Sequence, residues 1–68
     1  MWSKELQEIT REFFQTSPAG IVKRDEPFFS ALAIIKGDGT IVVSELEGDQ
    51  VWRYESVSTM IDDGWGVD

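Results

Sequence analysis

The sequence predicts a small α+β protein with an N-terminal helix, a three-stranded antiparallel β-meander and a short C-terminal helical turn. Residues 3–15 repeat apolar side chains at the spacing of an amphipathic helix. Residues 28–56 contain three runs of β-branched and aliphatic residues, separated by two turns that contain glycine. Because the whole chain has 68 residues, we expect one small domain over residues 1–68.

The N-terminal helix is expected over residues 3–15. Ser3 is a favourable N-cap residue, and Glu5 lies in the first turn, where the helix dipole stabilises an anion. Pro18 cannot continue a helix, so the helix ends before it. The apolar residues that share one side of this helix are Leu6, Ile9, Phe13 and Phe14.

The three strands are expected at residues 28–36, 40–46 and 50–56. Asp38-Gly39 suits a two-residue hairpin loop, and Gly48-Asp49 suits a second one. With these loops, Ile34 would face Val43 and Glu45 would face Trp52.

This register divides the strand residues into two faces, because successive side chains of a strand point to opposite sides. A half-exposed antiparallel sheet usually alternates apolar and polar residues, but here both faces are apolar. We therefore expect the N-terminal helix to cover one face, and the C-terminal segment or a second copy to cover the other. One face would carry Leu32, Ile34, Ile41, Val43, Trp52 and Tyr54. The other would carry Phe29, Ala31, Ala33, Ile35, Val42, Leu46 and Val51.

Residues 20–24 leave two alternatives open, an extra fourth strand beside residues 28–36 or a loop. Without the extra strand, residues 28–36 would form a bare, uncharged sheet edge, where two copies can pair across a two-fold axis. The candidate residues for self-association at this edge are Ala31, Ala33 and Ile35.

A helical turn is expected over residues 57–63, capped by Ser56 or Ser58 and ended by Gly64. The helix dipole disfavours the two carboxylates of its last turn. Either this helix is only one turn long, or a cation or a basic partner satisfies these groups. The tail, residues 64–68, places an aromatic side chain between glycines and carboxylates, which suits a docking segment. The candidate partner-binding residues are Trp65, Asp62, Asp63 and Asp68.

Trp65 also has a structural alternative, in which it packs on the apolar face of its own domain. The carboxylates around it do not have the spacing of a calcium-binding loop, so we predict no metal site. No catalytic constellation and no cofactor-binding motif is recognised, and cysteine and histidine are absent from the sequence. We therefore expect neither an enzyme nor a cofactor.

The charge argues against direct nucleic-acid binding. The chain has 13 acidic and 6 basic residues and a net charge of −7, which repels phosphate groups. No apolar run approaches the roughly 20 residues of a membrane span, and the N-terminal segment does not resemble a signal peptide. We expect a cytoplasmic protein that does not bind membranes.

Together these features predict a small acidic interaction module that binds another protein and forms a homodimer. Association is a common source of stability for short chains without disulfides or metal. The alternative is an acidic mimic of nucleic acid that inhibits a nucleic-acid-handling enzyme, as in phage-type anti-defence proteins. Residues 51–62, VWRYESVSTMID, resemble the end of the small KTSC module that is appended to some lysyl-tRNA synthetases. The N-terminal helix has no counterpart there, so we assign no family.

Overall fold

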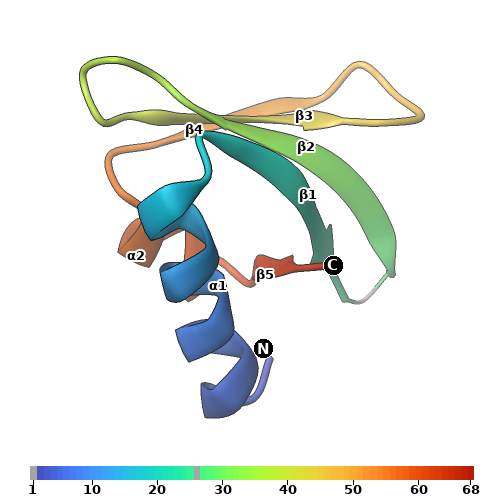
Figure 1. Cartoon of the computed structure of the whole chain (residues 1–68). Coiled ribbons are helices and arrows are strands. Elements are labelled where there is room, and N and C mark those ends of the chain that lie inside the picture. Colours follow the sequence, from blue (N-terminus) through green and yellow to red (C-terminus); the bar gives the residue numbers. More distant parts are fainter. Residues whose placement is uncertain (1, 26) are drawn as a thin grey trace.

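The computed structural model describes residues 2–25 and 27–68, and it shows an α+β fold with five strands rather than the predicted three or four. Strands β1 to β4 form an antiparallel meander, and β5 pairs with the free edge of β1 in the order β4-β3-β2-β1-β5. Both helices lie on the same side of the sheet (Figure 1). The elements are α1 (Lys4–Thr16), β1 (Ala19–Arg24), β2 (Phe29–Ile35), β3 (Ile41–Glu45), β4 (Val51–Tyr54), α2 (Val57–Asp62) and β5 (Gly66–Val67).

The structure confirms both predicted helices and their caps. The Ser3 hydroxyl accepts a hydrogen bond from the Leu6 amide at 3.2 Å, which satisfies one of the free N–H groups of α1. Ser56 caps α2 in the same way, because its hydroxyl accepts from the Thr59 amide at 3.2 Å. Gly64 follows α2 with a φ of 102°, the left-handed conformation that ends many helices.

Residues 20–24, for which a strand and a loop were both considered, belong to strand β1. This strand pairs with β2 from Ala19 to Arg24. Strand β2 is therefore central, between β1 and β3, and does not form the bare edge considered above. Its residues Ala31 and Ala33 are fully buried, and Ile35 packs against the core. These three residues face the interior and not a sheet edge.

The first hairpin departs from the predicted register by one residue. Ile35 pairs with Ile41, and the loop has three residues, with Gly39 at a φ of 90°. The Asp38 carboxylate accepts hydrogen bonds from the Thr40 amide at 3.0 Å and the Thr40 hydroxyl at 2.6 Å, and these bonds lower the pKa of Asp38. A type I turn followed by a left-handed residue is a common three-residue hairpin loop. The shift of one residue exchanges the faces of β2 relative to β3.

The second hairpin departs by two residues, which leaves the faces unchanged. Val43 pairs with Trp52, and the Glu45 amide donates to the Gln50 carbonyl at 2.9 Å, so the loop has four residues instead of two. A two-residue loop that begins with glycine usually needs a positive φ there, and Gly48 does not have one.

The core lies between the helices and the inner face of the sheet. Trp65 is at its centre, with its ring centroid 5.5 Å from that of Phe29 and 5.1 Å from that of Trp52. The core residues are Phe14, Val22, Ala31, Ala33, Ile41, Val43, Met60, Ile61 and Trp65.

Strand β5 is held between β1 and helix α1. The Thr10 hydroxyl is buried, donates to the Leu6 carbonyl at 2.7 Å and accepts from the Val67 amide at 2.9 Å. Gly66 lies so close to α1 that a Cβ atom there would come within 3.0 Å of a Leu6 methyl carbon. Neither of the two described helices has the length and apolar composition needed to cross a membrane.

Candidate functional site: the outer face of the sheet

The tail residue Trp65 is fully buried in this structure. Its indole Nε1–H donates to the Tyr54 hydroxyl at 2.8 Å, which satisfies the polar atom of the ring. In the single chain, Trp65 therefore packs in the core of its own domain, which is the structural alternative given above. Its ring is not exposed for docking.

Asp63 is held by a cation of the same chain. The Arg24 Nη2 atom lies 2.6 Å from the Asp63 Oδ2 atom and 2.7 Å from the Asp63 carbonyl oxygen. The Tyr54 hydroxyl also donates to the Asp63 carboxylate at 2.6 Å. Burial, together with this bond to a carboxylate, raises the pKa of Tyr54 to about 12. The unfavourable charge at the end of α2 is thus compensated within the chain.

The other two candidate carboxylates do not form a site together with Asp63. Asp68 lies 3.9 Å from the Lys23 Nζ atom, and Asp62 is exposed. Within residues 2–25 and 27–68, no three carboxylates are grouped as metal ligands. Asp63 and the tail residues Trp65 and Asp68 therefore mainly join the C-terminus to the rest of the domain.

The most prominent feature without a role in the core is the face of the sheet opposite the helices, which we call the outer face. Two rows of neighbouring residues cross its middle. Strand pairing places Val42, Ile34 and Ala19 beside Arg53 in one row, and Val51, Ser44, Leu32 and Ile21 in the other. Ile21, Ile34 and Val51 are 38%, 39% and 47% exposed.

Nothing described in the single chain covers the outer face, because α1 and α2 lie on the other side of the sheet and β5 extends its edge (Figure 1). The C-terminal segment was one of two candidates to cover the second face of the sheet. In the structure it does not cover the outer face. The residues of this surface differ from those predicted for either face, because Ile34 pairs with Val42 and not with Val43.

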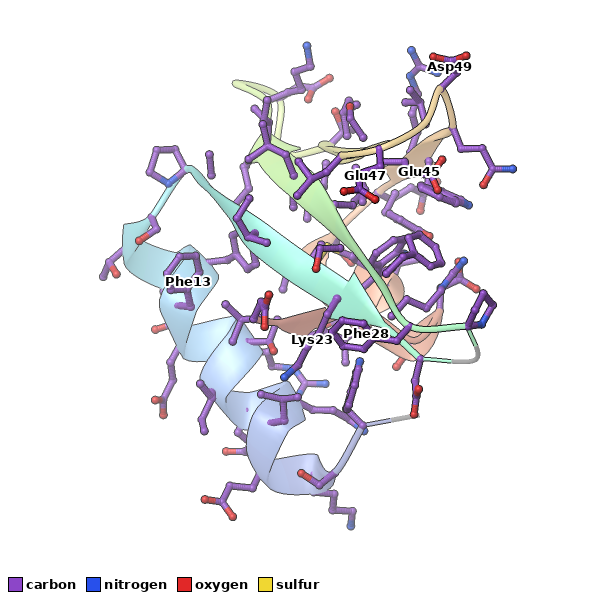
Figure 2. All side chains as sticks on the ribbon, turned by 90° about the vertical axis from the view of Figure 1, so that its right-hand side faces the viewer. Phe13, Lys23, Phe28, Glu45, Glu47 and Asp49 are labelled. Carbon is purple, nitrogen blue, oxygen red and sulfur yellow. The ribbon has the colours of Figure 1, made fainter. Side chains whose placement is uncertain are left out.

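Charged side chains are grouped at both ends of the sheet. Lys36, which follows β2, and Arg53, in β4, lie near the β2–β3 turn, beside an open hollow of about 610 Å³ that is also lined by Asp38 and Glu55. Glu47 and Asp49 lie in the β3–β4 loop at the opposite end of β3. Figure 2 views this end, where Glu45 and Glu47 lie side by side above Phe28 and Asp49 lies farther out on the loop.

A second hollow, of about 530 Å³, opens at this acidic end. Phe28 on its wall is 62% exposed, and Leu46 is 53% exposed. The apolar surface thus extends from the middle of the sheet to this end. Comparisons with protein-family models, with curated proteins and with solved structures give no significant match to the chain.

Proposed function

We propose that the chain is a small protein-interaction module that self-associates through the outer face of its sheet. The observation that carries the proposal is the group of exposed β-branched side chains there, Ile21, Ile34 and Val51, next to the partly buried Leu32 and Val42. Contiguous exposed apolar patches are uncommon on soluble monomers and often mark interaction sites. Antiparallel sheets that pack face to face bury such side chains between them.

The size of the face is adequate for an interface. The Cα trace measures 27 by 27 by 16 Å, so the broad side of the backbone covers roughly 700 Å² in projection. Stable interfaces bury about 600 to 1,000 Å² on each partner. An interface of this size would use a large part of one broad side, which fits a face-to-face arrangement.

Charge favours a second copy of the chain as the occupant. Two copies with a net charge of −7 repel each other over most of their surfaces. The two central rows of the outer face contain no acidic residue, and Arg53 is their one charged member. The outer face is therefore a surface on which two copies can approach with little repulsion.

The proposal can be tested by sedimentation velocity over micromolar to millimolar concentrations. We expect the wild type to dimerise with rising concentration and Ile34→Lys to remain monomeric, because a lysine in the middle of the face would have to be desolvated. General repulsion cannot explain that loss, since the added lysine changes the net charge from −7 to −6. A wild type that stays monomeric throughout would refute the proposal.

Ile9→Lys is the matched control. Ile9 on α1 is 46% exposed, similar to the 39% of Ile34, but it lies on the helix side of the molecule. Circular dichroism should show that both variants keep the native fold. Equal loss of dimer in both variants would point to a surface other than the outer face.

A second candidate function, the acidic mimic of nucleic acid, is favoured by a row of carboxylates on α1. Glu5, Glu8 and Glu12 are exposed and share one side of the helix. Such a mimic should slow DNA cleavage by a restriction enzyme at low salt, and the effect should decrease steeply as salt rises. If the triple glutamine variant inhibits as well as the wild type, this row is not the mimic surface.

A further inference from the structure

We infer that the hollow beside Phe28 binds an arginine side chain of a partner protein. The guanidinium lies against the Phe28 ring and binds the carboxylates of Glu45 and Glu47. Such a partner is a different protein, so the site does not depend on self-association. We call this hollow the acidic hollow, and its lining residues are Phe28, Phe29, Ser30, Glu45, Leu46 and Glu47.

Two segments of the chain form the walls of the acidic hollow. One wall is the start of β2 with Phe28 before it, and the other is the end of β3 with the loop that follows. The Leu46 amide donates a hydrogen bond to the Ser30 carbonyl at 3.3 Å, which joins the two walls. The Phe29 ring packs against Trp65 in the core, with centroids 5.5 Å apart. The hollow is therefore already formed in the single chain, as ligand sites usually are.

The acidic hollow combines an exposed aromatic ring with two carboxylates. Phe28 is 62% exposed, and Glu45 and Glu47 lie side by side above it (Figure 2). Among the residues that the structure describes, no lysine or arginine lines the hollow, and neither glutamate takes part in an ion pair. The negative charge and the face of the ring are thus both available to a cation.

The chain already holds one of its own arginines by the same combination of groups. The Arg24 guanidinium carbon lies 4.7 Å from the centroid of the Trp65 ring, and the Arg24 Nη2 atom lies 2.6 Å from the Asp63 carboxylate. A guanidinium is planar and carries five N–H donors, so it can stack on a ring and bind carboxylates at the same time. The compact ammonium of lysine does this less well. An arginine is therefore the better occupant.

Charge favours a basic partner over a second copy of the chain at this site. The net charge of −7 repels a second copy and attracts a basic protein. The hollow near the β2–β3 turn has no such preference, because Asp38 and Glu55 line it together with Lys36 and Arg53. The volume of the acidic hollow, about 530 Å³, lies within the range of about 300 to 1,000 Å³ that is typical of ligand pockets.

Peptide titrations followed by nuclear magnetic resonance test the site. The probe is an acetylated and amidated tripeptide with arginine between two glycines. Two comparison peptides carry lysine, which has the same charge, or citrulline, the neutral analogue of arginine. We expect the arginine peptide to shift the backbone amides of residues 28–30 and 45–47. It should bind about threefold more tightly than the lysine peptide and on the order of tenfold more tightly than the citrulline peptide.

Variants locate the binding. Glu45→Gln/Glu47→Gln should weaken binding of the arginine peptide by on the order of tenfold, because both charged acceptors are lost. Phe28→Leu keeps an apolar side chain but removes the ring, and should weaken binding by about threefold.

Glu5→Gln/Glu8→Gln on α1 is the matched control. Like the variant of the hollow, it changes the net charge from −7 to −5, because each substitution removes one negative charge. These two glutamates line a hollow together with Ile9 and not with an aromatic ring. The control should bind the arginine peptide within about twofold of the wild type, since distant exposed charges are screened by salt. Circular dichroism checks that each variant is folded.

Several results would overturn the inference. If the lysine or the citrulline peptide binds as tightly as the arginine peptide, or if the control loses as much affinity as Glu45→Gln/Glu47→Gln, the acidic hollow is not an arginine site. The same holds if the peptide shifts only amides elsewhere in the chain, or none. If a rise in protein concentration without peptide shifts the amides of residues 28–30 and 45–47, a second copy occupies the hollow instead. A wild type that is monomeric in sedimentation refutes the self-association but not this site, because the hollow exists in the single chain.

Discussion

One nitrogen of Arg24 binds two oxygen atoms of Asp63, the carboxylate at 2.6 Å and the backbone carbonyl at 2.7 Å. The same guanidinium lies 4.7 Å from the centroid of the Trp65 ring and 5.5 Å from that of the Trp52 ring. The end of β1 is thereby joined to the C-terminal end of α2, where a positive charge offsets the helix dipole. The packing of the tail against the sheet should therefore depend on this arginine.

We expect Arg24→Met to lower the free energy of unfolding by about 1 to 2 kcal/mol. The methionine keeps an apolar stem over the two indoles but loses the charged hydrogen bonds and the cation–π contact. The value is modest because the Asp63 side chain is half exposed and partly screened by solvent. Urea denaturation at one protein concentration measures it. Arg11→Met, on α1, is the control and should change stability by less than about 0.5 kcal/mol.

Thr10→Val tests how β5 is held. The substitution keeps the shape of a buried side chain but leaves the Val67 amide without its hydrogen-bond acceptor. Loss of such a buried partner costs about 1 to 3 kcal/mol. Denaturation should show this loss, and the Val67 amide should exchange faster with solvent.

Thr16→Val, at the exposed end of the same helix, is the control for Thr10→Val and should have little effect. If the two variants are equally stable and the exchange of the Val67 amide is unchanged, the Thr10 hydroxyl does not hold β5.

Tyr54 should make stability decrease above pH 10. Its pKa is raised from 10.0 to about 12 in the folded chain, so the folded state keeps the phenol proton where the unfolded state has lost it. This contribution is complete below pH 10 and is lost as the pH rises toward 12. Tyr54 is the chain's single tyrosine, so its ultraviolet absorbance follows the ionisation directly.

Tyr54→Phe is the comparison for the pH dependence. At neutral pH its free energy of unfolding should be lower by about 1 to 3 kcal/mol, because the buried Trp65 indole loses its hydrogen-bond acceptor. Its stability should then fall less steeply between pH 10 and 12 than that of the wild type. Parallel curves, or a phenol that ionises near pH 10 in the folded protein, would contradict the raised pKa.

Local sequence features were sufficient to predict much of the fold. Ser3, Ser56 and Gly64 mark helix ends through groups within a few residues, and both helices lie where these residues indicate. Strand β5 has only two residues and depends on Thr10, 57 positions away from Val67. A strand this short has no periodicity, so its existence could not be recognised from the sequence.

The candidate site was harder to predict than the fold. The tail drew attention because Trp65 lies between glycines and carboxylates, but its partners Phe29, Trp52 and Arg24 are distant in the sequence. The outer face was missed for a different reason. Its composition follows from the register of one hairpin, and an error of one residue assigns half of the side chains to the wrong side.

The turn Gly37-Asp38-Gly39 contains the ambiguity that caused this error, because either glycine can adopt a positive φ. In the structure Gly39 does so, at 90°, and Asp38 bonds to Thr40. A Cβ atom at Gly37 or at Gly39 would have no neighbour within 4 Å, so alanine at either position tests backbone conformation without a steric clash.

We expect Gly39→Ala to lower the free energy of unfolding by about 1 to 2 kcal/mol, because alanine disfavours a positive φ. Gly37→Ala should be neutral or slightly stabilising, since it restricts the unfolded chain at a position without a positive φ. Thermal and urea unfolding of the two variants at equal concentration gives the comparison. A larger loss at Gly37 than at Gly39 would place the left-handed residue elsewhere in the turn. The pairing of Ile34 with Val42, and with it the composition of the outer face, would then be wrong.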